Sequence, residues 1–319
     1  PAASGAVPDD GRELPLDCAP VTRSAETLSA DRATSGDASR GAAASDHTSS
    51  GEANSDPIAR GAYLARAGNC EGCHTARGGP PYGGGRGIQT PFGTVYAGNL
   101  TPDPQTGLGG WTPDDFRRAL HEGRSRDGRL LYPAFPYPNY SLVTARDADD
   151  LFAYLQSLKP VVRANPAHAL RFPFDTQMAL RAWRALYFEP TTFEPRADRP
   201  ADWNRGDYLI RGLGHCDACH SPRNLLGAIR GDSALSGGEL PGQFWYAPSL
   251  TANAEAGVGD WPHEEVVALL RDGVARQGSA IGPMADVVAT STRFLSAADL
   301  NAMATRLKAL AAGTSGAVG

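Results

Sequence analysis

The stretch Cys70-Glu71-Gly72-Cys73-His74 returns later in the chain as Cys216-Asp217-Ala218-Cys219-His220. Both follow the pattern Cys-x-x-Cys-His and use four of the chain's five cysteines. Two thiols one helical turn apart can add across the two vinyl groups of a haem, and the adjacent imidazole can reach the iron from the same side. The pattern therefore predicts two covalently bound haem c groups. Their attachment residues are Cys70, Cys73, Cys216 and Cys219, and their iron ligands are His74 and His220.

Other uses of paired cysteines fit the sequence less well. A redox-active dithiol of the thioredoxin kind needs a strand–helix–strand context, which the sequence does not indicate. A structural zinc site needs further ligands at paired spacing. A disulfide within each pair is the third alternative. Two occurrences of the full motif at equivalent places favour haem over all three.

The sequence around the two motifs is an internal repeat. The pattern Gly-x-Tyr-Leu precedes both cysteine pairs, at Gly61 and at Gly206, with one extra residue in the second copy. Farther along, three positions recur 150 residues apart: Gly107, Gly109 and Trp111 match Gly257, Gly259 and Trp261. The chain therefore contains two copies of one module, each of about 100 to 115 residues.

Composition narrows the class of protein. The 319 residues include 37 Gly and 25 Pro, which excludes long uninterrupted helices and coiled coils. The formal charge is −5 and there is no long basic run, so nucleic acid is not an expected partner. No run approaches the ~18 apolar residues of a membrane-spanning helix. The length and the 41% hydrophobic residues fit two domains with a core each.

We expect five segments along the chain. Residues 1–56 are rich in small and polar residues, which predicts a disordered arm. Residues 57–160 and 201–312 are the two modules, residues 161–200 connect them, and residues 313–319 form a tail. The arm carries Cys18, for which the motifs provide no role.

The predicted fold class is all-α, with a few helices per module joined by long loops rich in Gly and Pro. In the first module Thr112 is a candidate N-cap, Pro113 the first helical residue and Gly123 the stop. The second module repeats this helix up to Gly273. Closing helices are expected at about 148–158 and 296–310, and a connecting helix at about 178–187. Strand signals are weak throughout.

With these motifs the chain resembles the class I cytochrome c modules in the haem subunits of bacterial periplasmic alcohol, gluconate and aldehyde dehydrogenases. The resemblance covers roughly residues 58–310. Besides the motifs above, it includes Asn99-Leu100-Thr101-Pro102, Leu131-Tyr132-Pro133, Trp203-Asn204-Arg205-Gly206 and Gly282-Pro283-Met284. Many relatives carry three such modules and a membrane-associating tail, whereas two modules are found here.

The resemblance implies electron transfer from the catalytic subunit of a periplasmic dehydrogenase to a quinone or oxidase. No nucleotide-binding fingerprint, nucleophile elbow or general-base pair stands out, so no catalytic residue is assigned. The expected location is the periplasm, with a targeting segment removed before Pro1 and any membrane association made through a partner. An adaptor tethered by the arm and Cys18 is a further alternative.

The two modules differ where the second axial ligand is expected. Cytochromes c commonly hold the iron between a histidine and a methionine, and the resemblance implies a Met late in each module. Met284 takes this place in the second module. Phe135 takes it in the first, 16 residues before Leu151, and the spacing from Met284 to Leu300 is the same. A phenyl ring has no lone pair and cannot bind iron.

Three interpretations of the first haem remain open. In the first, the iron is five-coordinate or water-bound and Phe135 screens an open face. In the second, another residue serves as a substitute ligand. In the third, a Met has been lost from this particular sequence. The candidate substitutes are His121, His168, Met178, Tyr132, Tyr137 and Tyr140. An open iron makes a haem enzyme or a ligand-binding cytochrome the alternative function, with peroxide, a small gas or a sulfur oxyanion as its ligand.

Several other residues are weaker candidates around the haems. Arg77 and Arg223 follow their histidines by three, and with Trp111 and Trp261 they could satisfy haem propionates, although a surface Arg and a core Trp are equally good interpretations. A backbone carbonyl close to each iron-binding histidine, near Pro80 or Pro222, is expected to accept its Nδ1 proton. His215 is predicted to be exposed. Met303 belongs to a helical apolar stripe and is predicted to lie in the core.

Overall fold

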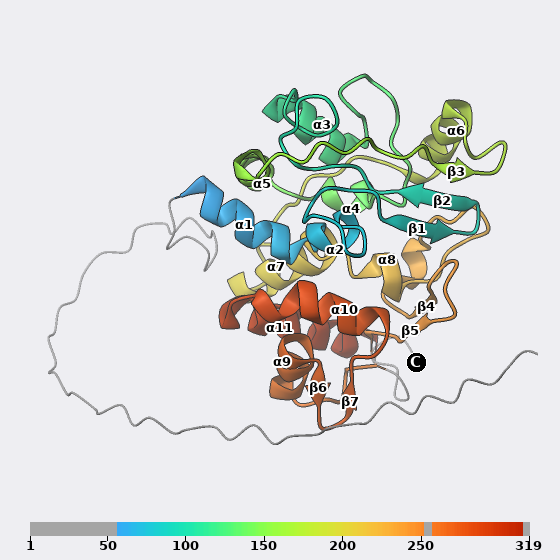
Figure 1. Ribbon diagram of the computed structural model, residues 1–319. Coiled ribbons are helices and arrows are strands. Elements are labelled where there is room, and N and C mark those ends of the chain that lie inside the picture. The colour runs from blue at the N-terminus through green and yellow to red at the C-terminus, as the bar shows by residue number, and fades with distance from the viewer. Residues whose placement is uncertain (1–55, 252–256, 315–319) are drawn as a thin grey trace, which may run out of the picture. The chain divides into compact units, whose positions relative to one another are not determined.

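Helices account for most of the regular structure in residues 56–251 and 257–314, the parts that the computed structural model describes (Figure 1). They belong to one compact unit, His47–Gly319. Outside the described residues lie the predicted arm except Asp56, with Cys18, and the last five residues of the predicted tail. The predicted helical character is confirmed, and short strands are added to it.

Residues 57–160, here called the first half, hold five helices and a hairpin in the order α1, α2, β1, β2, α3, α4, α5. Their bounds are Pro57–Ala67, Cys70–His74, Gly87–Thr90, Gly93–Tyr96, Pro113–Glu122, Tyr137–Tyr140 and Ala145–Ser157. Helix α1 packs along α5. A Cβ atom on Gly61 would overlap the Asp150 backbone carbonyl, so this glycine permits the close approach of the two helices.

Residues 201–312, the second half, repeat this order with one more hairpin, β6 and β7, before the last two helices. The bounds are α7 Ala201–Tyr208, α8 Asp217–His220, β4 Gly238–Glu239, β5 Tyr246–Ala247, α9 His263–Asp272, β6 Val274–Ala275, β7 Gly278–Ser279, α10 Pro283–Thr290 and α11 Ala297–Thr314, with 3₁₀ turns at Gly231–Ser233 and Thr292–Phe294. Helix α7 packs along α11 as α1 does along α5 (Figure 1). Gly206 has the role of Gly61, because a Cβ there would overlap the Ala302 carbonyl.

The extra residue of the second copy is accommodated in a π-helix. This π-helix, Leu209–Leu213, directly follows α7, and the Gly214 N–H donates to the Leu209 carbonyl at 2.7 Å. A hydrogen bond that spans five residues takes up one inserted residue without ending the helix. In the first half the corresponding bond spans four, from the Gly68 N–H to the Leu64 carbonyl at 2.8 Å. Both cysteine pairs therefore begin directly after matching helix ends.

The strands are short hairpins that the sequence did not predict. β1 and β2 pair antiparallel with Gly87 opposite Tyr96, and the connector adds β3, Ala169–Leu170, on the other side of β2. β4 pairs with β5 in the second half, with no third strand among the described residues. Strands of two to four residues are too short to show a recognisable alternation of apolar and polar residues. The predicted connecting helix is present as α6, Gln177–Tyr187.

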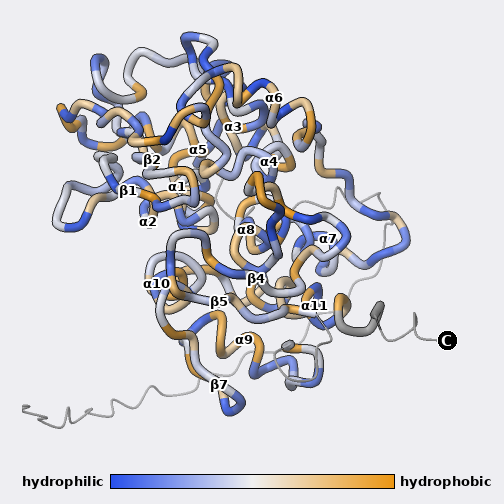
Figure 2. Tube along the Cα trace, turned by 90° about the vertical axis from the view of Figure 1, so that its right-hand side faces the viewer, coloured by the Kyte–Doolittle hydropathy of each residue, from blue (hydrophilic) through white to orange (hydrophobic). Residues whose placement is uncertain are grey.

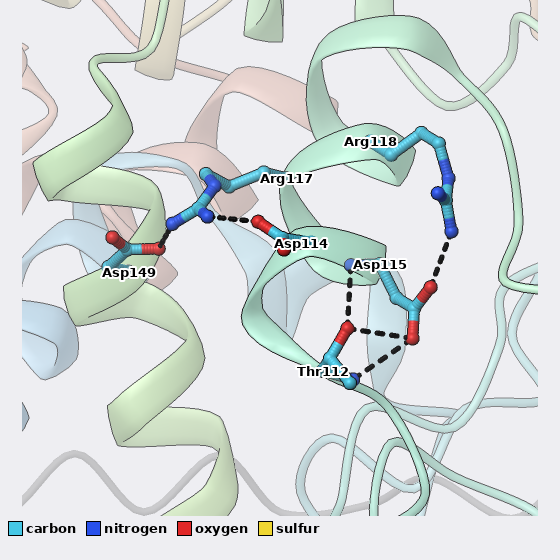
Figure 3. A network of polar contacts seen from close by, with 6 residues as sticks. All are labelled: Thr112, Asp114, Asp115, Arg117, Arg118 and Asp149. Carbon is cyan, nitrogen blue, oxygen red and sulfur yellow. Dashed lines mark hydrogen bonds and ion pairs between the residues drawn. The ribbon is translucent and has the colours of Figure 1, made fainter.

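Helix α3 begins and ends where the sequence predicts. The Thr112 hydroxyl oxygen accepts the Asp115 N–H at 3.2 Å, and the Asp115 carboxylate accepts the Thr112 N–H at 3.0 Å, which is a capping box (Figure 3). Arg117 pairs with Asp114 in its own helix and with Asp149 in α5 (Figure 3). The helix therefore carries its own start signal and an ion pair that ties it to α5.

One contiguous cluster of buried apolar side chains runs through both halves. Leu151 on α5 and Leu300 on α11, which match in the repeat, are 3% and 1% exposed. Met303 is 3% exposed, which confirms its predicted place in the core. Among the described residues no helix combines the length and apolarity needed to cross a membrane, and hydrophobic and hydrophilic colours alternate along the tube in Figure 2.

Each half donates a tyrosine hydrogen bond to an aspartate of the other half. The Tyr63 hydroxyl on α1 donates to Asp299 on α11 at 2.6 Å, and the Tyr208 hydroxyl on α7 donates to Asp147 on α5 at 2.6 Å. Both tyrosines come from the Gly-x-Tyr-Leu repeat. Each aspartate also pairs with an arginine of its own half, Arg60 or Arg205, at 2.8 Å. The repeated tyrosine therefore acts in the opposite half, not its own.

Candidate haem-attachment sites

The four motif cysteines are not bonded to one another. None of these described cysteines forms a disulfide; Cys70 and Cys216 are half-buried, and Cys73 and Cys219 are exposed. Burial raises the pKa of Cys70 and of Cys216 to about 12. A redox-active dithiol needs a thiol with a lowered pKa, so these environments do not fit that alternative.

The two motif histidines have the same hydrogen bond. His74 Nδ1 lies 2.7 Å from the Gly98 carbonyl oxygen, and His220 Nδ1 lies 2.7 Å from the Pro248 carbonyl oxygen. Burial lowers the pKa of both rings, which favours neutral imidazole. A carbonyl can only accept, so Nδ1 carries the proton and Nε2 keeps its lone pair for a metal. The predicted backbone acceptor is confirmed, but Gly98 and Pro248 provide it.

Short polar turns hold these two carbonyls. Directly after Gly98, the side-chain oxygen of Asn99 accepts the Thr101 N–H at 2.9 Å. Directly after Pro248, the hydroxyl oxygen of Ser249 accepts the Thr251 N–H at 3.1 Å. The sequence contains the matching segments Asn99-Leu100-Thr101 and Ser249-Leu250-Thr251, but neither indicates this role. Each segment orients one of the two histidines through the carbonyl that precedes it.

The expected distal positions lie in matching places of the two halves. Phe135 lies in the turn before α4, with its ring centroid 5.4 Å from that of Tyr140. Met284 is the second residue of α10 and packs against the core. It follows Gly282, whose φ is +54° and where a Cβ would overlap the Trp245 ring. The indole and the left-handed glycine together fix the turn that presents Met284.

The supporting candidates differ between the halves. Arg77 is exposed, whereas the Arg223 guanidinium donates to the Ala218 carbonyl at 2.6 Å and to the Gly227 carbonyl at 2.7 Å. Trp111 and Trp261 are both half-buried against the core. Arg223 Nε is buried without a partner in the described part of the chain. A propionate role for these four residues stays a prediction.

The sequence expectation for His215 is wrong. An exposed side chain is predicted, but His215 is half-buried, with its ring centroid 5.5 Å from that of Tyr140. Its φ is +38°, and its Nδ1 lies 2.8 Å from the Leu213 carbonyl. The left-handed backbone turns the ring inward, and no sequence signal marks this conformation at a histidine.

Each attachment segment also touches the other half. Asn139 on α4 donates from its side chain to the Asp217 carboxylate, between Cys216 and Cys219, at 2.6 Å. The Thr290 hydroxyl at the end of α10 donates to the side chain of Asn69, the residue before Cys70, at 2.8 Å. The short helix at the expected distal position of each half, α4 or α10, is therefore anchored beside the cysteine pair of the other half.

Each half therefore places a cysteine pair beside a neutral histidine that presents Nε2, which is the arrangement expected of a c-type cytochrome site. Comparison with known proteins agrees. The Cytochrome c family model matches residues 58–159. The "Diheme cytochrome c-type" protein of Cereibacter sphaeroides is 37% identical over 255 residues, which cover 78% of this chain and 84% of that protein. The chain belongs to the cytochrome c family.

Other relatives are named as subunits of dehydrogenases. "Gluconate 2-dehydrogenase cytochrome c subunit" of Pantoea cypripedii is 39% identical over 269 residues, covering 82% of this chain and 61% of that protein. "Alcohol dehydrogenase (quinone), cytochrome c subunit" of Gluconobacter oxydans is 39% identical over 265 residues, which cover 80% of this chain and 55% of that protein. The chain thus spans a little more than half the length of these two relatives.

Proposed function

We propose that this chain is a dihaem c-type cytochrome that carries electrons from a partner dehydrogenase to a respiratory acceptor. The observation that carries the proposal is the duplicated site, with two Cys-x-x-Cys-His segments whose histidines are both neutral and both oriented by a backbone carbonyl. Duplication of a complete site is expected where each copy holds the same group.

In this proposal residues 57–160 and 201–312 are two tandem class I cytochrome c modules joined by the connector 161–200. Cys70, Cys73 and His74 hold the first haem; Cys216, Cys219, His220 and Met284 hold the second. When bound, the haem supplies one-electron redox chemistry. The chain attaches the haems, keeps both histidine rings in one orientation and fixes the spacing of the two sites through the contacts between the halves.

The partners follow from the names of the relatives, which include cytochrome c subunits of gluconate and alcohol dehydrogenases. We propose the catalytic subunit of a periplasmic dehydrogenase as electron donor and a quinone or oxidase as acceptor. Covalent haem attachment supports a location in the periplasm, and attachment to the membrane would be made through a partner.

The proposal is tested by producing the chain with the cellular machinery that attaches haem to cysteines. We expect two haems per chain in a pyridine haemochrome assay, and reduction of both when the copurifying dehydrogenase receives its substrate. A chain that matures with fewer than two haems, or that the dehydrogenase does not reduce, would contradict the proposal.

A further inference from the structure

The strongest difference between the two sites is at the distal position, and the structure supports the sequence alignment there. Leu151 and Leu300, from which Phe135 and Met284 are counted, are both buried on the closing helix of their half. Those helices, α5 and α11, pack against α1 and α7 in the same way. Phe135 therefore occupies in the first half the place of Met284 in the second.

Phe135 also lies close to the first attachment segment. Its ring packs against Tyr140, whose hydroxyl donates to the Gly68 carbonyl, two residues before Cys70, at 3.1 Å. Phe135 and Tyr140 thus form an aromatic wall beside the first pair of cysteines.

Among the sulfur and imidazole substitutes, the methionines and His168 have surroundings that do not fit a ligand of the first haem. Met178 on α6 is 78% exposed, and Met303 is buried in the core on α11. His168 Nδ1 accepts the Tyr96 N–H at 3.2 Å, outside the helical core. His121 lies on α3 near the charged residues Arg117, Glu122 and Asp149, and its Nε2 is buried without a partner in the described part of the chain, which leaves it as the remaining imidazole candidate. The three methionines of the chain are thereby accounted for.

The tyrosine substitutes have other contacts. The Tyr140 hydroxyl is bonded to the Gly68 carbonyl, as described above. Burial raises the pKa of Tyr132, which disfavours the phenolate form that binds iron. The Tyr137 hydroxyl has no hydrogen-bond partner among the described residues, but its ring is fully buried, 4.8 Å from the Phe188 ring. A ligand role would therefore break the Tyr140 hydrogen bond or the packing of Tyr137.

We propose that the first haem site is a ligand-binding site, closed on the side opposite His74 by the phenyl ring of Phe135 and open to small neutral diatomic molecules such as CO or NO. This rests on the proposed function, since it requires the first haem to be attached. The rings that pack against Phe135 are those of Tyr137 and Tyr140. The Arg184 guanidinium lies over the Tyr137 ring, 5.2 Å from its centroid, and donates to the Glu122 carbonyl. The two tyrosine rings themselves present apolar surface, which does not replace the hydration that an anion would lose, so neutral ligands are favoured over azide or cyanide.

Binding forms one bond from the diatomic ligand to the ferrous iron, with no change of oxidation state and no proton transfer. The second site is expected to stay closed, because the thioether of Met284 would hold the corresponding position when the haem is bound. The protein therefore combines one haem that exchanges ligands with one that exchanges electrons only.

The test is a titration of the dithionite-reduced holoprotein with CO, followed by absorbance. We expect one CO per chain in the natural sequence, none in Phe135→Met and two in Met284→Phe. Phe135→Leu is the matched control, which removes the ring without adding a ligand and should still bind one CO per chain.

Absence of CO binding in the natural sequence would overturn the proposal, as would unchanged binding in Phe135→Met. Both results are distinct from failure of the proposed function, which would appear as a missing haem or as no reduction by the dehydrogenase. Circular dichroism and haem content of each variant identify any that fail to fold. If Phe135→Met fails to fold, Met284→Phe and Phe135→Leu still decide between one open site and none.

Discussion

The two halves of the molecule share the same arrangement of helices and differ in the residue at the expected distal position. Both have a glycine at a helix crossing, a tyrosine that reaches into the other half, and a histidine held by a carbonyl. They differ at Phe135 and Met284, and in the hairpin, which is extended by β3 only in the first half among the described residues. The repeat therefore preserves the cysteine pair and the oriented histidine, and it varies the side chain at the proposed distal position.

The largest expected effect tests whether the two cysteine pairs are equivalent, and it is the loss of one haem. We expect the double change Cys70→Ala with Cys73→Ala to leave one haem per chain, and Cys216→Ala with Cys219→Ala to do the same, because each pair holds one group. Pyridine haemochrome content per chain is the measurement. A pair whose loss leaves two covalent haems, or abolishes both, would show that the sites are not independent copies.

The crossing glycines should also be equivalent. Gly61→Ala and Gly206→Ala each place a methyl group into a backbone carbonyl of the partner helix. We expect each to lower the free energy of unfolding by about 2 to 3 kcal/mol, since well-packed backbone cannot move aside cheaply. Thermal unfolding of the holoprotein measures the loss.

Gly231→Ala is the control for these two changes. A Cβ at Gly231 meets no atom within 4 Å, so we expect a change within about 0.5 kcal/mol. Equal effects of all three substitutions would rule out the close-approach explanation.

The exchanged tyrosines provide a smaller and pH-dependent effect. Tyr63→Phe and Tyr208→Phe each leave a buried carboxylate without one donor, and we expect a loss of about 1 to 3 kcal/mol for either. Chemical denaturation at neutral pH compares the two. A loss in only one of them would show that the exchanged contacts are not equivalent.

The stability of the protein at alkaline pH separates the contribution of the Tyr63 hydroxyl group from that of the packing of its ring. Burial, with a further contribution from Asp299, raises the pKa of Tyr63 from 10.0 to about 12, so the folded state favours the neutral hydroxyl. This stabilisation is complete below pH 10 and is lost as the pH rises toward about 12. Tyr63→Phe should therefore reduce the alkaline loss of stability that the natural sequence shows.

The smallest expected effect is confined to one half. Thr112→Ala removes the capping box of α3, whereas the equivalent helix α9 has no side-chain cap at Pro262. We expect a loss of about 1 kcal/mol, and Thr112→Ser should restore most of it because the hydroxyl returns. Denaturant unfolding measures both, and a neutral Thr112→Ala would mean that tertiary packing alone fixes the start of α3.

Sequence reasoning reached the features that have local or periodic signals. The start and stop of α3 follow from Thr112 and Gly123, and the core position of Met303 follows from a helical stripe. The attachment motif is local as well, since five consecutive residues carry its chemistry. Each of these signals lies within one or two helical turns of the residue that it predicts.

The remaining features depend on distant contacts or on backbone atoms. The Tyr63 to Asp299 bond joins residues 236 apart. The acceptor at Gly98 is a backbone carbonyl, which every residue possesses, so no residue type in the sequence predicts it. The inward turn of His215 depends on a left-handed backbone at a residue that seldom adopts it. Such features become visible only when the two halves are packed.

The most direct test of the difference between the two sites is the electron paramagnetic resonance spectrum of the fully oxidised holoprotein. A haem with histidine and methionine ligands is low-spin, whereas a haem that lacks a strong distal ligand is high-spin. We predict one low-spin and one high-spin ferric signal of equal weight, assigned by the loss of the high-spin signal in Phe135→Met. Two low-spin signals in the natural sequence would contradict this prediction.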